Sequence, residues 1–112
     1  MSNWRNSQND NLFAAFLQLK TLDEVAAFCR DLMTEAEINE FSGRWAVAQA
    51  LSSGKPQRQV SAETGVSIAT VTRVNQWLKR GMGGYQNVID KFQKTLTNSH
   101  HHSPAPELAS TS

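Results

Sequence analysis

Apolar side chains recur at intervals of three and four residues along most of the chain, with polar residues between them. This spacing is typical of amphipathic helices, because residues three and four apart share one helix face. It predicts helices over residues 11–20, 22–33, 35–53, 56–64, 68–80 and 85–96. No segment shows a convincing strand pattern. The pattern therefore predicts an all-α fold of six helices.

Residues that start or stop helices lie at the edges of these apolar stretches. Thr21 and Thr34 are each followed three positions later by a glutamate, Glu24 or Glu37, which is the spacing of a capping box at a helix start. Gly54 follows the third stretch and suits the left-handed conformation at a helix end. The other boundary signals are Pro56 in the first turn of the fourth helix, Ser67 as the cap of the fifth, and the break from Gly81 to Gly84.

Residues 57–80 have the pattern of a helix-turn-helix, in which two short helices meet at a tight turn marked by Gly65. Val71, Val74 and Leu78 share one face of the second helix and can pack on the first. The opposite face carries side chains that can donate hydrogen bonds to phosphates and base edges: Thr70, Arg73, Asn75, Gln76 and Lys79. A plain helical hairpin is the alternative, because short turn patterns of this kind also arise by chance.

The net charge of +1 hides an uneven distribution of charge along the 112 residues. Residues 55–80 hold five basic residues against Glu63 alone, a local charge of +4. Residues 1–54 hold four basic residues against seven acidic ones, a local charge of −3. A basic segment that coincides with a helix-turn-helix pattern indicates nucleic-acid binding. We therefore expect double-stranded DNA as a partner.

The apolar stripes of the first helices are wider than a small helix-turn-helix unit can cover. A monomer would leave much of Leu12, Phe13, Phe16, Leu17 and Phe28 exposed. Exposed apolar patches of that kind mark interfaces. We therefore expect a homodimer, which would also place two reading helices about 34 Å apart in successive major grooves.

Other classes of function lack their signatures. Cys29 is the single cysteine and lies among apolar residues, so we expect a buried, inert thiol. His100, His101 and His102 could ligate a metal, but adjacent histidines rarely close a site without further ligands, so we expect no metal or cofactor. No apolar run approaches the roughly 20 residues of a membrane span, and the first residues lack the apolar core of a signal peptide. We expect a cytoplasmic protein that is not an enzyme, because no catalytic set of residues is visible.

The chain has room for one domain. Residues 1–10 are polar and are expected to form a flexible N-terminal arm, although Trp4 could dock on the body or on a partner. Residues 11–96 would form a DNA-binding and dimerisation domain. Residues 97–112, rich in Ser, Pro and Ala, are expected to be a disordered tail.

Two segments carry a resemblance to a known family. They are MTEAEINEFSGRWAVAQAL, from Met33, and QRQVSAETGVSIATVTRVN, from Gln57, in which IATVTR is the most specific part. They resemble the Trp repressor superfamily, and more closely its Trp-repressor-like branch of the YerC/YecD type, over residues 11–95. The resemblance implies a six-helix Trp-repressor-like fold, an intertwined homodimer built from the N-terminal helices, and a DNA-binding transcriptional regulator.

The resemblance also implies roles for individual residues. It puts Ile68, Ala69 and Thr70 at base edges, Thr72 on a phosphate, and Gln57 and Arg58 beside the groove. Together with the polar face and the cap, the predicted DNA-binding set is Gln57, Arg58, Ser67, Ile68, Ala69, Thr70, Thr72, Arg73 and Lys79.

The match to the family's ligand site is incomplete. Arg44 and Arg73 match the two arginines that contact bound tryptophan in the Trp repressor proper, although either could instead bind phosphate or a glutamate. Where a glycine and a serine are expected, this chain has Val74 and Trp77, which would fill the slot. We therefore expect a repressor that binds DNA without tryptophan, with Trp77 holding the reading helix. The alternatives are a repressor that responds to tryptophan or another small ligand, and a dimeric protein-interaction module.

Overall fold

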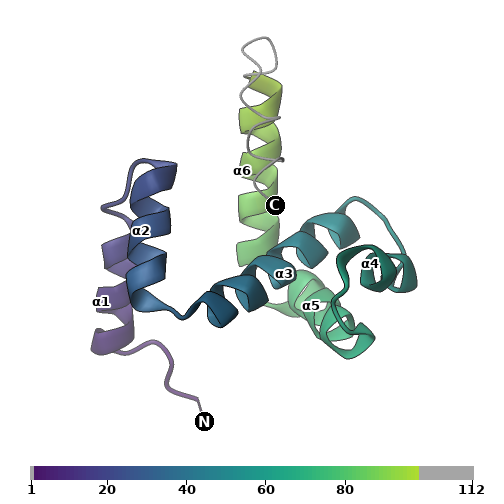
Figure 1. Ribbon diagram of the computed structural model, residues 1–112, viewed down its shortest axis with the longest axis horizontal. Helices are drawn as coiled ribbons and strands as arrows, with labels where there is room; N and C mark the ends of the chain where they lie inside the picture. Colours follow the sequence, from purple (N-terminus) through teal and green to yellow (C-terminus); the bar gives the residue numbers. More distant parts are fainter. Residues whose placement is uncertain (1, 99–112) are drawn as a thin grey trace. The chain divides into compact units, whose positions relative to one another are not determined.

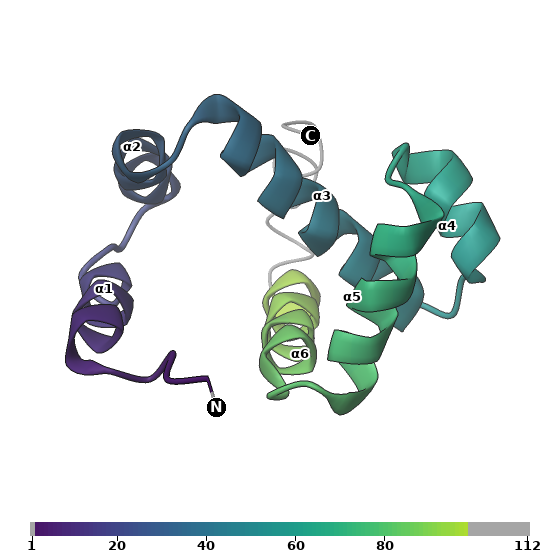
Figure 2. The same cartoon turned by 90° about the horizontal axis from the view of Figure 1, so that it is seen from below.

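The computed structural model describes residues 2–98, which form six helices and no strand (Figures 1 and 2). The helices are α1 (Ser7–Phe16), α2 (Leu22–Leu32), α3 (Glu35–Ser52), α4 (Gln57–Thr64), α5 (Ile68–Arg80) and α6 (Gly84–Asn98). The all-α fold expected from the apolar pattern is confirmed. The chain divides into two compact units at residue 40, so that α3 begins in the first unit and continues into the second.

α1 begins at Ser7, inside the segment expected to be a flexible arm. The side-chain oxygen of Asn6 accepts a hydrogen bond of 2.8 Å from the backbone amide three residues on, and so caps the helix. Trp4 packs edge-to-face on Phe13 of α1, with 6.1 Å between the ring centroids. Residues 7–10 are therefore helical rather than part of an arm, because an asparagine cap among polar residues leaves no apolar signal.

α1 ends at Phe16, earlier than expected, and the amides of the next three residues donate to carbonyls three positions back, as in a turn. Thr21 caps α2 with φ −121° and ψ 159°, and its hydroxyl accepts a 3.1 Å hydrogen bond from the Glu24 amide. The Glu24 carboxylate accepts one of 2.8 Å from the Lys20 amide. The predicted capping box is thus present in a form that reaches one residue further back.

Helices α1 and α2 bury no side chain completely. Phe16 and Phe28 pack edge-to-face with 5.2 Å between their centroids. Leu17, in contrast, is 81% exposed. Cys29 is half-buried rather than buried as expected. The apolar stripes of the first two helices are therefore only partly covered.

The capping box predicted at the start of α3 is complete. The Thr34 amide donates to the Glu37 carboxylate at 2.9 Å, and the Glu37 amide donates to the Thr34 hydroxyl at 3.1 Å. Beyond the other end of α3, Gly54 has the predicted left-handed conformation, with φ 100°. Pro56 is the N-cap of α4 rather than a member of its first turn. Both ends of α3 therefore follow from local sequence.

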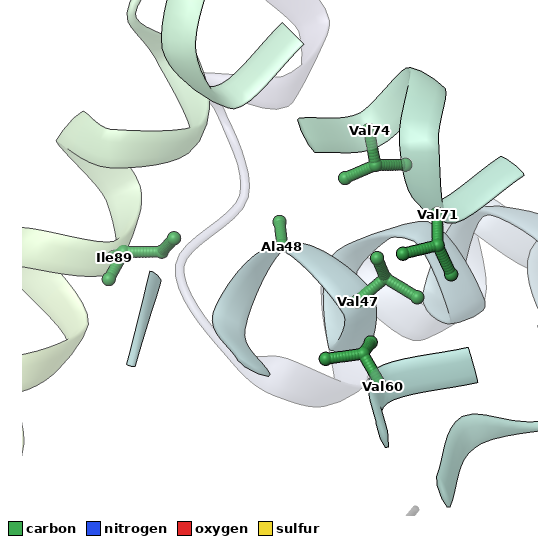
Figure 3. Packing of buried hydrophobic residues seen from close by; sticks show 6 residues of the cluster. All are labelled: Val47, Ala48, Val60, Val71, Val74 and Ile89. Atoms are coloured by element: carbon green, nitrogen blue, oxygen red, sulfur yellow. The ribbon is translucent and has the colours of Figure 1, made fainter. Parts of the chain in front are cut away.

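The core of the second unit is built mostly from valines of α3, α4 and α5 (Figure 3). Its buried side chains are Val47 and Ala48 of α3, Val60 of α4, Val71 and Val74 of α5, and Ile89 of α6. Val71 and Val74 are completely buried and Leu78 packs against the cluster, which confirms the predicted apolar face of α5. Burying one such side chain contributes about 1.5–3 kcal/mol. The core therefore fixes α5 against α3 and α4.

The predicted glycine-rich break separates α5 from α6. α5 ends at Arg80, and α6 begins at Gly84 and continues to Asn98. Residues 97 and 98, assigned from the sequence to a disordered tail, are therefore helical, because the helix continues past the last apolar position of its pattern. The rest of that tail lies outside the described residues.

Candidate nucleic-acid interface

A short turn joins α4 to α5, and side-chain hydrogen bonds fix its shape. Gly65 ends α4 in the left-handed conformation, with φ 78°, which a side chain would strain. The Ser61 hydroxyl donates to the Val66 carbonyl at 2.7 Å. The Ser67 hydroxyl then accepts a 3.2 Å hydrogen bond from the Thr70 amide and caps α5. Local contacts therefore set the direction in which α5 leaves the turn.

The first turn of α5 is presented to solvent. Ser67, Ile68 and Ala69 are exposed, and Thr70 is half-buried. Ile68 is 48% exposed and lies outside the buried core, although it is apolar. An exposed apolar side chain beside hydroxyl groups matches the major groove, where thymine methyl groups lie among hydrogen-bonding base edges.

A chain of hydroxyl groups connects this turn to Arg73. The Ser67 hydroxyl donates to the Thr70 hydroxyl at 3.2 Å. The Arg73 guanidinium donates to the same Thr70 oxygen at 3.1 Å. Arg73 is exposed. Its positive charge is therefore held at the start of α5, beside the residues predicted to meet base edges.

α4 contributes the remaining candidates on its first turn. The Thr72 hydroxyl of α5 donates to the side-chain oxygen of Gln57 at 2.9 Å and so links the two helices. Arg58 is exposed on α4, and Lys79 is exposed in the last turn of α5. The predicted DNA-binding residues thus contain two hydrogen-bonded groups, one joining Gln57 to Thr72 and one along the start of α5.

The four candidates for ligand contact have different surroundings in the structure. Val74 is completely buried in the core. The guanidinium carbon of Arg44 lies 5.5 Å from the ring centroid of Trp77 and 5.4 Å from that of Phe41. Arg73 instead hydrogen-bonds at the start of α5. The structure therefore pairs Arg44 with Trp77 and directs Arg73 toward the DNA-binding candidates.

An apolar hollow of about 580 Å³ lies beside Trp77, which is 43% exposed. It is lined by Trp45, Trp77, Gly81, Met82, Gly84, Tyr85 and Val88. Trp45 stacks on Tyr85 with 6.4 Å between their centroids. Burial raises the pKa of the Tyr85 hydroxyl, and the nearby Arg44 charge only partly opposes this. The hollow is therefore suited to apolar contact.

Two polar residues outside the predicted DNA-binding set share a second hollow with members of that set. Lys55 and Asn75 line it together with Gln57 and Lys79. Asn75 was visible in the sequence as part of the polar face of α5, whereas only the charge of residues 55–80 pointed to Lys55. The packing of α5 against α3 and α4 brings them together, which spacing alone does not reveal.

Residues 2–98 offer neither a metal site nor a membrane span. In this range, no group of three or more His, Cys, Asp or Glu side chains is arranged to hold a metal ion. No helix of this range is long and apolar enough to cross a membrane. His100, His101 and His102, considered above as metal ligands, lie outside the described residues.

Residues 7–93 match the model of the family described as Trp repressor protein. The uncharacterized protein YerC of Bacillus subtilis (strain 168) is 37% identical over 95 residues, which cover 85% of this chain and 91% of that protein. The crystal structure of a TrpR-like protein from Eubacterium eligens ATCC 27750 has a TM-score of 0.76 at 36% identity, covering 80% of this chain and 93% of that chain. The crystal structure of a Trp repressor candidate from Staphylococcus aureus has a TM-score of 0.75 at 34% identity, covering 80% of this chain and 89% of that chain.

Proposed function

Because the chain belongs to the Trp repressor family, whose members are DNA-binding regulators rather than enzymes, we propose that it is a cytoplasmic transcriptional repressor. In this proposal it binds a two-fold-symmetric DNA site as a homodimer and needs no tryptophan. α4 and α5 act as a helix-turn-helix, with the start of α5 in the major groove. The carrying observation is the exposed first turn of α5, where Ile68 lies beside the hydrogen-bonded hydroxyls of Ser67 and Thr70.

Different residues contact the bases and the phosphates of the DNA. Ile68, Ala69 and Thr70 at the start of α5, with Arg58 of α4, discriminate between sequences. Arg73 and the other cations of the helix pair hold the DNA backbone and supply most of the affinity. The local charge of +4 on residues 55–80 supports this division, because it lies on the same two helices and the loop before them.

The pairing of Arg44 with Trp77 supports binding without tryptophan. The arginine of α3 already stacks on an indole of α5. Val74, one turn earlier on α5, is completely buried in the core. In this proposal, side chains of this protein hold α5 against α3, and no small molecule is required to position it.

Exposed apolar side chains support the homodimer. In the first unit, Leu17 and Leu22 are open to solvent. In the second unit, Met82 is 83% exposed beside the apolar hollow, and Val88 is also exposed. A second copy of the chain would remove such faces from water.

The test begins by selecting bound DNA sequences from a random pool with the full-length protein. Its affinity for the selected sequence is then measured at several salt concentrations. We expect affinity to fall steeply with salt. Arg58→Ala and Thr70→Ala should abolish specific binding while light scattering still reports a dimer. Lys91→Ala, on the exposed side of α6, is the matched control and should bind as the unmodified protein does.

Two results would contradict the proposal. One is a pool without enrichment, together with salt-independent binding, which would favour the protein-interaction module. The other is a monomer at the concentrations at which specific DNA binding is observed, because a single reading helix has no two-fold site to match.

A further inference from the structure

We propose that the polar hollow where α3, α4 and α5 meet is a phosphate notch, which takes one backbone phosphate of DNA. This inference rests on the proposed function and adds a site and two residues to it. The hollow has a volume of about 380 Å³. Its polar lining comes from Lys55, Gln57, Asn75 and Lys79.

The four polar side chains provide hydrogen-bond donors from three parts of the fold. Lys55 comes from the loop after α3, Gln57 opens α4, and Asn75 and Lys79 lie one turn apart on α5. Ammonium and amide groups both donate to phosphate oxygens. The Gln57 oxygen already accepts from Thr72. The amide nitrogen of Gln57 is therefore the part of that side chain left to donate into the hollow.

The start of α4 adds a second, independent attraction for an anion. Pro56, its N-cap, has no side-chain oxygen and makes no capping hydrogen bond in the structure. The first backbone amides of α4 therefore have no side-chain acceptor, and they lie at the positive end of the helix dipole. Pro56 and Gln57 both line the hollow, so this end of α4 opens into it. Uncapped helix starts of this kind bind phosphate groups.

Glu63 competes with a phosphate for Lys55. The Lys55 ammonium donates to one Glu63 carboxylate oxygen at 2.8 Å, and the Gln59 amide donates to the other at 2.8 Å. Both charged side chains are about half exposed, so the ion pair is screened by water and weak. A DNA phosphate in the notch can therefore draw Lys55 away from Glu63, the only acid in residues 55–80.

The position of the notch favours a DNA phosphate over a free anion. Gln57 lies in the notch and is bonded to Thr72, so the notch continues the polar surface that carries the DNA-binding candidates. Lys79 stands on the same helix as the base-reading turn, two to three turns further on. A backbone that passes the start of α5 therefore has a phosphate position within reach of both lysines.

The experiment measures DNA affinity against salt for Lys55→Gln, Lys79→Gln, the double variant, Lys79→Arg and Glu63→Gln. Each single glutamine variant should weaken binding about 3- to 10-fold for all sequences alike. The double variant should lower the salt slope by about 1, the value for one lost phosphate contact. Lys79→Arg should restore most of the affinity, and Glu63→Gln should tighten binding severalfold. Lys91→Gln on α6 is the matched control and should change nothing.

The outcomes separate this inference from the proposed function. Failure of the unmodified protein to bind DNA would overturn both. Specific DNA binding with lysine variants that behave like Lys91→Gln would overturn the notch alone. Inorganic phosphate that saturates the Gln57 and Arg58 amide shifts in NMR spectra without weakening DNA binding would mark a small-anion site and overturn the assignment to DNA. Circular dichroism of each variant verifies that the helices are intact.

Discussion

The guanidinium carbon of Arg44 on α3 lies 5.5 Å from the ring centroid of Trp77 on α5. The same guanidinium is 5.4 Å from the ring of Phe41, one turn earlier on α3. Arg44 is half-buried, which strengthens its attraction to an aromatic face by reducing competition from water. This contact fastens α5 to α3 three turns beyond the cap at Ser67. It links the last turns of α5 to α3 through side chains of the chain itself.

Removing either partner should loosen α5. We expect Arg44→Ala to lower the free energy of unfolding by about 1–2 kcal/mol, because a cation-π contact is lost. Urea denaturation followed by circular dichroism measures this. Arg5→Ala is the control, since Arg5 also lies over a ring, 5.6 Å from Trp4, but on the exposed N-terminal segment. An equal change in urea midpoint for both variants would contradict the specific role of Arg44.

L-Tryptophan should leave operator affinity unchanged in the unmodified protein. The reason is that the Arg44 guanidinium already has an indole partner in Trp77 and Val74 fills the core beside it. A titration of the selected DNA, with and without L-tryptophan, measures the ratio of the two dissociation constants. Tenfold tighter binding with the amino acid would show that a ligand, and not Trp77, positions α5.

Gly81, after the end of α5, and Gly84, the first residue of α6, should respond differently to alanine. A Cβ atom on Gly81 would collide with the Trp77 carbonyl oxygen, to which the Gly81 amide donates at 2.9 Å. Gly84, the first residue of α6, has open space at that position. We expect Gly81→Ala to cost about 1–3 kcal/mol of stability. Gly84→Ala should be neutral or slightly stabilising, because alanine favours helices. Equal thermal unfolding midpoints for the two variants would refute this account.

Alkaline pH should destabilise the fold through Tyr85, the only tyrosine. Burial raises the pKa of its hydroxyl in the folded state above the ordinary value of 10.0. The stabilisation from this shift is therefore complete below the unfolded-state pKa and is lost as pH rises through the folded-state pKa. Ultraviolet titration of the phenolate should give a midpoint above 10.0 that falls on adding denaturant.

The Arg44→Ala variant provides the control for this titration. The positive charge of Arg44 favours the ionised phenolate, so its removal should move the Tyr85 midpoint further up. A midpoint in the folded protein at or below its value in denaturant would contradict the burial of Tyr85.

Local sequence predicted most helix boundaries because caps depend on residues three positions apart. The boxes at Thr21 and Thr34 and the cap at Ser67 are all present. α1 was misplaced because its cap, Asn6, has no apolar pattern beside it to mark the start. The exposed start of α5 was also predictable, since Val71 and Val74 fix the side that faces the core.

By itself, then, the sequence determined the six helices, their apolar faces and the basic character of the α4–α5 pair. These properties depend on neighbours within one or two helical turns. Only the tertiary structure decided that Arg44 lies over the ring of Trp77 and that Lys55 and Lys79 share one hollow. Those side chains come together only once the valine core has packed α5 against α3 and α4. Packing of distant segments has no signature in the spacing of residues along the chain.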